Sequence, residues 1–499
     1  MSNIRVTYSG LIAFAVGIVS IITGAVFTII ITRQLSVEEF GTWSLIGSVL
    51  AYTLLMESTI FYWIIRESAR NISSGKTGIA TSGMFSVIAM LVYVIISSLI
   101  GKQSNADISM MIFAVILVPV NFLDHTLRGI SQGWKPNIDS YSFIGIEISK
   151  VPIGLFLIYF LELGLFGLIV TIVIGNIVSI IIQASYNKEK LKGKFQVKFI
   201  KKWLKLSWIV LYKDIPNTVY ISDIVIFSAI VGNVTGLAYI AAARAISTIV
   251  KHSQRINIAV YPTILAGGRQ EYLQENLMKI FYFSFPAIAF AITFARPGLF
   301  TLNPEYVIAA SVVGILAIRE FAATINRVYR IALQGIEKVD VSENSSFKEY
   351  LKSNLILVPT VRMIQYVSYA ILLVIGLYIL VNEGLSQINL VEYWAYVSLI
   401  VEIPFVIYFS ILIKRNFTLN FDFKAIVKYI VSCLIAFGFT FILMENFLIY
   451  EISVFDFLPN LLPYIFLSLG SYLVLTAILD QKTRILFISI INEIRSLKK

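Results

Sequence analysis

The chain has 499 residues, of which 58% are hydrophobic, with a mean hydropathy of +0.83 and a formal net charge of +11. This composition is far more apolar than a soluble core requires, and it excludes a soluble globular protein. Loop topology and anionic inner-leaflet lipid account for the positive charge, so nucleic acid is not an expected partner.

The apolar residues occur in runs of about 18–27 residues, the length at which an α-helix crosses a bilayer core. We therefore predict an all-α polytopic membrane protein with about 14 transmembrane helices. In chain order the predicted spans are residues 9–31, 40–65, 79–100, 110–127, 141–160, 165–184, 206–231, 237–261, 278–295, 306–333, 355–380, 391–413, 425–443 and 461–479.

The basic residues divide unequally between the two sides of the predicted membrane. The odd-numbered loops hold only Arg33, Lys102 and Arg296, whereas about 32 of the 40 Lys and Arg residues fall on the other side. Basic loops stay in the cytoplasm. The sequence therefore predicts a multi-pass protein of the cell membrane with both termini cytoplasmic.

Several classes of site are excluded by residue counts. A single cysteine, Cys433, and two histidines cannot build a disulfide, a zinc site or an iron–sulfur cluster within one chain. We expect no metal and no cofactor. The first apolar run lacks a small-residue cleavage site, so we expect a retained span. The odd-numbered loops are short, so any function must lie between helices.

The longest polar interruption, residues 187–205, separates the sixth and seventh spans. Phe195, Phe199, Trp203 and Leu206 would lie near one helix face, with five lysines largely on the others, which is typical of an amphipathic helix lying on the inner leaflet. A basic loop that merely obeys the topology rule is the alternative. The predicted organisation is an N-lobe (1–186), this linker (187–205), a C-lobe (206–420), two additional spans (421–480) and a cytoplasmic tail (481–499).

Basic residues inside predicted spans are the main functional signal, because a charge at membrane depth is costly and seldom faces lipid. In span eight, Arg244, Lys251 and Arg255 fall within an arc of about 40° at 100° per residue, so they would form one basic stripe. Arg319 in span ten and Arg362 in span eleven lie deep by this count. Snorkelling to the surface is an alternative for Arg255. The five residues are candidates for binding an anionic head group, because guanidinium groups recognise phosphate with paired hydrogen bonds.

Acidic residues and one proline inside spans are candidates for coupling or gating. Asp223 and Pro216 lie in span seven, where the proline allows a hinge. Glu57 in span two and Asp124 in span four are either coupling carboxylates or structural pairs. Glu147 and Lys150 in span five are one turn apart, so an intrahelical ion pair is the simplest interpretation and a gating role is the second.

Three short motifs resemble the polysaccharide-exporter family, over roughly residues 5–445. The first is Arg33-Gln34-Leu35-Ser36-Val37-Glu38-Glu39-Phe40-Gly41, with Arg66 at the end of the following span. The second is the series Pro216, Asp223, Gly232, Gly236, Tyr239 and Arg244, and the third is Asn303-Pro304-Glu305-Tyr306. The chain departs from the family at Ser36 and Asn303, where glycine is common, and at Glu57-Ser58, where an acidic residue followed by glycine is frequent.

This resemblance implies the fold of the multidrug/oligosaccharidyl-lipid/polysaccharide exporter superfamily: two six-helix lobes around a central cavity plus two extra C-terminal helices. It also implies a flippase that moves polyprenyl-(pyro)phosphate-linked oligosaccharide from the cytoplasmic to the outer leaflet by alternating access. The implied partners are this lipid-linked substrate, membrane lipid and glycan-assembly proteins.

Two other functions remain open at the level of sequence. A cation-coupled multidrug exporter of the same fold would depend on a carboxylate such as Glu57. A membrane glycosyltransferase would need acidic residues on outer loops, where Glu38 and Glu39 form the only such pair. No large loop follows them, so we expect a transporter without catalytic residues.

Overall fold

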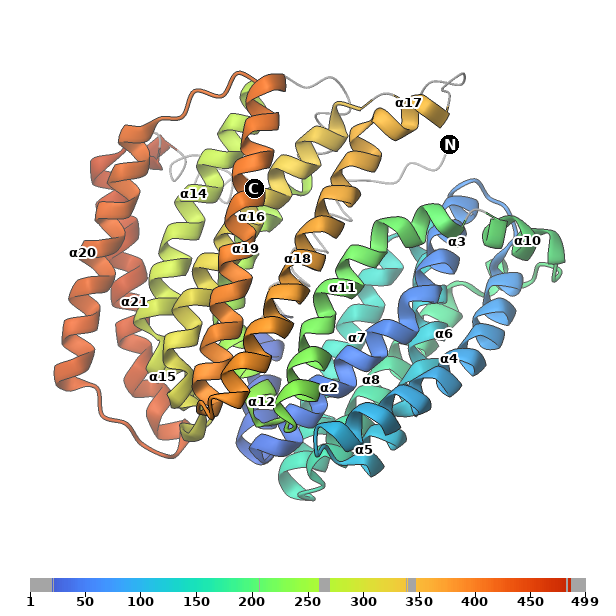
Figure 1. The fold of residues 1–499 in the computed structure, drawn as a ribbon, viewed down its shortest axis with the longest axis horizontal. Coiled ribbons are helices and arrows are strands. Elements are labelled where there is room, and N and C mark those ends of the chain that lie inside the picture. The colour runs from blue at the N-terminus through green and yellow to red at the C-terminus, as the bar shows by residue number, and fades with distance from the viewer. Residues whose placement is uncertain are drawn as a thin grey trace, which may run out of the picture. The chain divides into compact units, whose positions relative to one another are not determined.

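Every element of the described chain is helical. The computed structural model describes residues 20, 22–205, 207–259, 270–337, 339, 347–481 and 483–485. Within them, 11 helices are long and apolar enough to cross a membrane, and a bent pair makes a twelfth. The contacts divide the chain into two compact units, Met1–Ala238 with Tyr366–Leu390 (unit 1) and Tyr239–Gln365 with Val391–Lys499 (unit 2) (Figure 1).

The helices up to residue 231 all belong to unit 1. They are Ile22–Gln34, α2 (Val37–Thr53), η1 (Leu54–Met56), α3 (Glu57–Ala69), α4 (Gly75–Gln103), α5 (Ile108–Phe113), η2 (Ala114–Ile116), α6 (Leu117–Trp134), α7 (Asn137–Gly154), the π-helical η3 (Leu155–Phe160), α8 (Gly164–Tyr186), α9 (Lys188–Leu191), α10 (Val197–Lys205) and α11 (Ser207–Val231).

The remaining helices belong to unit 2, or cross the division within α12, α18 and α19. They are α12 (Thr235–Ser247), the 3-10 helix η4 (Thr248–Ala259), α14 (Gln270–Thr293), α15 (Ala295–Leu302), η5 (Pro304–Ala309), α16 (Ala310–Gly335), α17 (Phe347–Lys352), α18 (Asn354–Asn382), α19 (Gln387–Asn416), α20 (Phe423–Phe447) and α21 (Val454–Leu479).

The positions of the predicted spans are confirmed where the structure describes them. Each of the spans three to seven and nine to fourteen coincides with one of the 11 long apolar segments, and span two is the pair α2 and α3, bent by 55°. Span one is described only as the short helix Ile22–Gln34, and most of residues 1–21 lie outside the description. Span eight begins as α12 and continues as η4 to Ala259.

The faces of α4 show how these helices meet a membrane. Its buried face carries small or hydroxyl-bearing residues such as Gly78, Ser82 and Ser86, whereas Met84 and Leu91 on the opposite face are 62% and 64% exposed. Small residues allow close helix packing, and large apolar side chains match lipid. This pattern is the reverse of a helix in a soluble protein, so the exposed face is a lipid-facing face.

The acidic pair of the first motif has a structural role. Ser36 is the N-cap of α2: its hydroxyl accepts from the Glu39 N–H, and the Glu39 carboxylate accepts from the Ser36 N–H. Serine at this position thus supplies a capping box. The other oxygen of Glu39 accepts the N–H of Leu165 at 2.9 Å, at the start of α8. Glu39 is therefore engaged in joining α2 to α8, which removes support for a catalytic role on this loop.

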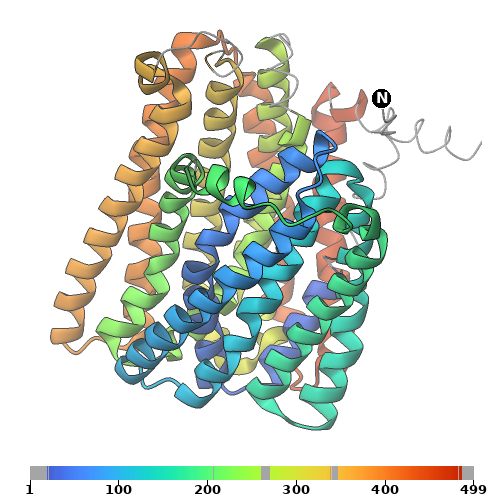
Figure 2. The same cartoon turned by 90° about the vertical axis from the view of Figure 1, so that its right-hand side faces the viewer.

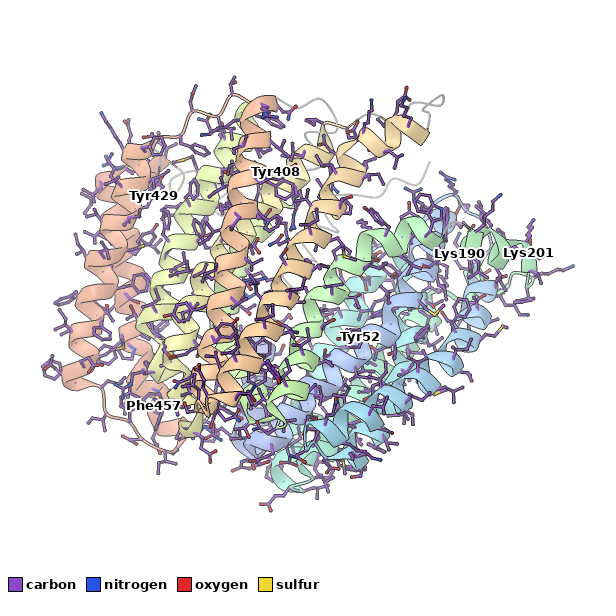
Figure 3. The ribbon with its side chains drawn as sticks, in the orientation of Figure 1. Tyr52, Lys190, Lys201, Tyr408, Tyr429 and Phe457 are labelled. Carbon is purple, nitrogen blue, oxygen red and sulfur yellow. The ribbon has the colours of Figure 1, made fainter. Side chains whose placement is uncertain are left out.

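The linker forms α9 and α10, and α10 crosses α3 and α4 near their ends rather than running along them (Figure 2). Phe199 and Trp203 are buried with Ile60, Ile64 and other residues of α3 and α6. The lysines of this segment that are exposed are Lys188, Lys192, Lys194, Lys198, Lys201, Lys202 and Lys205, and the Lys201 side chain points away from the helices (Figure 3). The aromatic residues Phe199 and Trp203 thus pack on protein, whereas the sequence predicted that they lie on the inner leaflet, and Phe195, which precedes α10, is 45% exposed.

Unit 2 holds two apolar cores that share α14. One joins α14 and α16 to the beginning of α18 and the end of α19, around Leu277, Val328 and Phe409. The other joins α14 to the C-terminal pair α20 and α21, around Tyr429 and Phe457 (Figure 3). The two extra C-terminal helices therefore pack against one another and against α14. Most of the predicted tail, from residue 486 onward, lies outside the described residues.

Candidate binding and coupling residues

Arg244 on α12 is half-buried and lies over an aromatic ring of the same unit. Its guanidinium carbon is 5.0 Å from the centroid of the Trp394 ring on α19, and Trp394 is fully buried. The attraction between a cation and a ring face favours a guanidinium at this position. This geometry suits recognition of a phosphate oxygen by Arg244.

Arg319 on α16 is 8% exposed, so its side chain does not face lipid. One of its terminal nitrogens donates to the carboxylate of the neighbouring Glu320 at 2.5 Å. A buried arginine with an adjacent carboxylate is less costly than an isolated charge. This pair gives Arg319 a structural partner that sequence reasoning did not consider.

A buried polar network ties three helices of unit 2 together. The Glu402 carboxylate on α19 accepts from the amide nitrogen of Asn326 on α16 at 2.5 Å, and from that of Gln365 on α18 at 2.7 Å. These three side chains are 4%, 0% and 1% exposed. Glu402 lies at the middle of α19, where a charged group costs about 2.5–3.5 kcal/mol by insertion scales.

The network gives a reference height from which the positions of the arginines along the helix axes can be worked out. The N–H of Asn354 at the start of α18 donates to Glu337, just beyond the end of α16, so α16 and α18 run antiparallel. Arg319 precedes Asn326 by seven residues and Arg362 precedes Gln365 by three. At 1.5 Å per residue, Arg319 lies about 10 Å to one side of the network and Arg362 about 4–5 Å to the other.

Arg244 falls on the same side as Arg319. Hydrogen bonds of Ser311 to Glu392 and of Asn326 to Glu402 show that α16 and α19 run in the same direction. Arg244 lies over the ring of Trp394. Trp394 precedes Glu402 by eight residues, which corresponds to about 12 Å along the axis of α19. The structure therefore brings Arg244 and Arg319 to one level and places Arg362 on the opposite side of Glu402.

The predicted basic stripe of span eight is not preserved. At Thr248 the α-helix changes to the 3-10 helix η4, which has about three residues per turn. The turn per residue after Thr248 is therefore about 120°, not the 100° on which the predicted stripe depends. The Lys251 side chain is exposed. Arg255 belongs to η4, and its side chain lies outside the described part of the structure.

Glu57 is buried at the bend of span two, in unit 1. It begins α3 directly after the 3-10 turn η1, and its side chain is 3% exposed. One carboxylate oxygen is 2.8 Å from Nδ1 of His125 on α6, and the other has no hydrogen-bond partner among the residues that the structure describes. The side chain of His125 is 38% exposed. A buried carboxylate that contacts an accessible imidazole can exchange protons with solvent, so the geometry fits a coupling group.

Asp124 is fully engaged in structural contacts. It forms an ion pair with Arg128 at 2.8 Å and accepts hydrogen bonds from Ser179 at 2.5 Å and Gln183 at 3.0 Å. These contacts join α6 to α8 and satisfy the carboxylate. Of the two interpretations that the sequence allowed for Asp124, the geometry favours a structural pair.

Glu147 and Lys150 form the intrahelical ion pair that their spacing predicts. Nζ of Lys150 is 2.6 Å from the Glu147 carboxylate, and both side chains are largely buried. The same carboxylate accepts a short hydrogen bond from the hydroxyl of Thr23 in the first helix. The pair therefore also connects α7 to the helix Ile22–Gln34.

Asp223 and Pro216 both lie in α11 of unit 1, and both are buried. Asp223 is 1% exposed and accepts from the hydroxyl of Tyr369 on α18 at 3.0 Å. The hydroxyl of Ser48 on α2 donates to the carbonyl of Ile221, close to Asp223 in sequence. These contacts join α11 to α2 and to the second part of α18.

Sequence reasoning missed Glu402, Gln365, Trp394 and Glu67. A signal existed for Glu402, which is an isolated acidic residue in the centre of span twelve. No sequence signal indicates that Gln365 and Asn326 meet it, because the three residues come from different helices. Glu67, which is 2% exposed, accepts from the Trp203 indole at 3.2 Å and from Lys202 at 3.3 Å.

The fold is similar to that of solved membrane transporters, two of which are described as members of the MOP superfamily. The solved structure of the lipid II flippase MurJ, in an inward closed conformation, is similar with a TM-score of 0.62 and 16% identity, over 94% of this chain and 98% of that chain. An inward-facing multidrug resistance MATE transporter is similar with a TM-score of 0.57 and 13% identity, over 81% and 98%. A MOP superfamily transporter from Pyrococcus furiosus gives 0.52 and 13%, over 82% and 95%.

No profile of a known protein family matches the chain. No curated protein sequence matches it either. The similar solved structures are transporters rather than enzymes, and at 13–16% identity they establish the fold alone.

Proposed function

We propose that this chain is a flippase that moves a polyprenyl-(pyro)phosphate-linked oligosaccharide from the cytoplasmic to the outer leaflet, by alternating access. The fold supports this proposal because one protein that shares it is a lipid II flippase. The sequence motifs of the polysaccharide-exporter family point in the same direction. Both termini would be cytoplasmic, and the glycan would contribute to a cell-surface polysaccharide.

The proposal rests mainly on one observation: Arg244 and Arg319 lie at a similar height along the helix axes of unit 2. Both belong to helices of unit 2, where the side chain of Arg319 is buried and that of Arg244 is half-buried. Two guanidinium groups at one depth can bind the oxygens of a phosphate or pyrophosphate with charge-assisted hydrogen bonds. The polyprenyl chain would remain in lipid, because its transfer into a polar site would expose apolar surface to water.

In this proposal, Arg244 and Arg319 bind the head group first. Arg362, on the other side of Glu402, would contact it at a different stage of translocation, and Lys251 and Arg255 would attract it from the basic-loop side. Asp223 and Pro216 would position α11 for the conformational change. We assign Glu147 and Lys150 to holding the first helix, and Asp124 to joining α6 and α8.

The test is translocation of lipid-linked glycan, measured as protection of the glycan from a membrane-impermeant probe. Loss of a hydrogen bond to a charged group costs about 1.5–3 kcal/mol, on the order of 10- to 100-fold in binding. We expect Arg244→Ala to reduce translocation by this order, and Arg244→Lys to retain part of it because the charge remains. Arg415→Ala, at the exposed end of α19, is the matched control.

Membrane insertion and monodispersity of each variant are measured alongside. Normal translocation by a correctly inserted Arg244→Ala protein would refute the assignment of the head-group site.

A second function, cation-coupled export of drugs, is supported by the Glu57–His125 pair and by the similarity to MATE transporters. It predicts that overexpression confers drug resistance, that Glu57→Gln abolishes this resistance, and that surface glycan is unchanged when the gene is deleted. Loss of surface glycan on deletion would decide for the flippase.

A further inference from the structure

A groove with an apolar part and a polar end runs between α14 and α20, which pack side by side in unit 2 (Figure 1). The apolar part has a volume of about 420 Å³ and lies along α14 from Phe285 to Thr293 and along α20 from Ile430 to Phe441. At 1.5 Å per residue, these stretches are about 12–17 Å long, which is half of the hydrocarbon thickness of a bilayer. The apolar part therefore has the length of one acyl chain of a membrane lipid.

Small residues deepen the apolar part of the groove. Ala289 on α14 and Gly438 on α20 both line it, and a Cβ atom added to Gly438 would meet no atom within 4 Å. Leu434 and Phe441 line it as well and remain 69% and 46% exposed. A concave apolar surface contacts more of a flexible chain than the convex face of a single helix does, so this groove can hold one lipid in place.

The groove becomes polar at the end where α14 meets α15. The polar part has a volume of about 240 Å³ and adjoins the apolar part, because Ile292, Thr293 and Phe441 line both. Its lining includes Arg296 at the start of α15 and Glu445 near the end of α20. Both side chains are exposed, and neither forms an ion pair with another described residue. This end therefore offers one positive and one negative charge to a ligand.

Aromatic contacts indicate that the polar end lies at the depth of lipid head groups. Tyr450 lines this end, and its ring centroid is 5.3 Å from that of Phe457 on α21 and 5.0 Å from that of Phe300 on α15. Aromatic clusters of this kind are typical of the membrane–water interface. Burial raises the pKa of the Tyr450 hydroxyl, while the charge of Arg296 lowers it and that of Glu445 raises it, so both charges act on this hydroxyl.

The two charges match a zwitterionic head group with a primary ammonium. A guanidinium binds phosphate oxygens with paired hydrogen bonds. A carboxylate accepts hydrogen bonds from an ammonium group, which has three donors, whereas a trimethylated ammonium has none. A head group with a phosphate and no ammonium would place a second negative charge near Glu445 without balancing it.

We propose that the groove between α14 and α20 binds one glycerophospholipid with a phosphoethanolamine head group. Its phosphate contacts Arg296, its ammonium contacts Glu445, and one acyl chain lies beside Gly438. On the predicted topology this lipid belongs to the outer leaflet. The arginines proposed to bind the transported head group lie on α12, α16 and α18, which do not supply these three residues, so the lipid in the groove is a bound membrane lipid and not the cargo. Binding would hold α20 against α14, and the site does not depend on the proposed flippase activity.

The experiment is a lipid titration of the purified full chain in detergent, followed by native mass spectrometry, which gives the dissociation constant of the first bound lipid. Phosphatidylethanolamine, phosphatidylcholine and phosphatidylglycerol with identical acyl chains are the three probes. We expect phosphatidylethanolamine to bind about tenfold more tightly than either of the others, as a hydrogen bond between charged groups provides.

Three variants separate the parts of the site. Arg296→Ala should weaken phosphatidylethanolamine binding about tenfold or more. Glu445→Gln should lower the affinity for phosphatidylethanolamine to that for phosphatidylcholine, because only the contact with the ammonium is lost. Gly438→Leu, which fills the groove, should weaken the binding of all three lipids by a similar factor.

Two matched controls should bind the lipids as the unchanged chain does. Lys102→Ala removes an exposed basic side chain at the end of α4, on the same predicted side of the membrane as Arg296. Gly470→Leu enlarges a glycine of α21 at which an added Cβ would also meet no atom within 4 Å, and Gly470 lines neither part of the groove.

Equal affinities for the three lipids would overturn the proposal, and so would unchanged phosphatidylethanolamine binding by Arg296→Ala. Tighter binding of phosphatidylglycerol than of phosphatidylethanolamine would overturn it in favour of a site for anionic lipid. If Arg296→Ala does not fold, Glu445→Gln decides: a retained preference for phosphatidylethanolamine over phosphatidylcholine overturns the site. No glycan lipid is present in this experiment, so its failure would leave the flippase proposal standing, whereas normal translocation by Arg244→Ala would do the reverse.

Discussion

Gly41, in the first motif, should tolerate no larger residue, because it lies against the backbone that leads into α12. A Cβ atom added to Gly41 would be 2.1 Å from the carbonyl oxygen of Val234 and 2.8 Å from its carbonyl carbon. Cβ contacts below 3.0 Å are essentially never seen, so α2 and the segment around Val234 would have to separate by about 0.9 Å or more. Overpacking of this kind costs about 1–3 kcal/mol, and more when backbone must move.

The comparison with Gly47 isolates this steric cost. Gly47 lies in the same helix, and a Cβ added there would meet no atom within 4 Å. Replacing glycine with alanine in a helix interior stabilises by about 1 kcal/mol, and this gain applies at both positions. We expect Gly47→Ala to stabilise by about 1 kcal/mol, and Gly41→Ala to lie about 1–3 kcal/mol below it.

Equilibrium unfolding in mixed micelles of a mild detergent and sodium dodecyl sulfate, followed by tryptophan fluorescence, gives the two free energies of unfolding. Equal stabilities for the two variants would show that Gly41 does not approach Val234 closely, and would refute the argument.

Two further predictions concern α10 and the start of α5. Trp203→Phe removes the indole donor to the buried Glu67 carboxylate, so we expect a loss of about 1.5–3 kcal/mol of unfolding free energy. The same unfolding assay measures this loss. An unchanged stability would show that the contact of Glu67 with Lys202 is sufficient. Hydrogen bonds from the Ser109 hydroxyl, and then from the Met110 N–H, hold the pKa of Asp107 below its ordinary value despite partial burial. Because a lowered folded-state pKa stabilises above the unfolded value, Asp107→Ala should cost about 1 kcal/mol near neutral pH, and the cost should shrink as pH falls through about 4 and below; a cost that is independent of pH between 7 and 3 would contradict this.

The membrane topology could be predicted because its physical cause is local. A span is recognised from its own run of apolar residues, and the loop charges supply an independent constraint. The predictions that fail concern positions where the pattern of residues within one helix is insufficient. The change from α-helix to 3-10 helix at Thr248 has no helix-breaking residue that would indicate it in the sequence.

The candidate site was only partly accessible to sequence reasoning. Periodicity identifies which residues share a face of one helix, so the Glu147–Lys150 pair was predicted correctly. It does not reveal which faces of different helices meet. Contacts between residues far apart in the chain place Arg244 and Arg319 on one side of Glu402 and Arg362 on the other. Such contacts also place Arg244 over the ring of Trp394.

The sequence by itself determined that this protein crosses a membrane many times and is helical throughout its described part, because hydropathy and backbone hydrogen bonding act within each span. It also identified the charged side chains that lie at membrane depth. Only the tertiary structure decided which of them have partners. Glu402 meets two amides from other helices, and Glu39 meets the start of α8, because the free energy of a buried charge depends on neighbours that helix packing alone brings within reach.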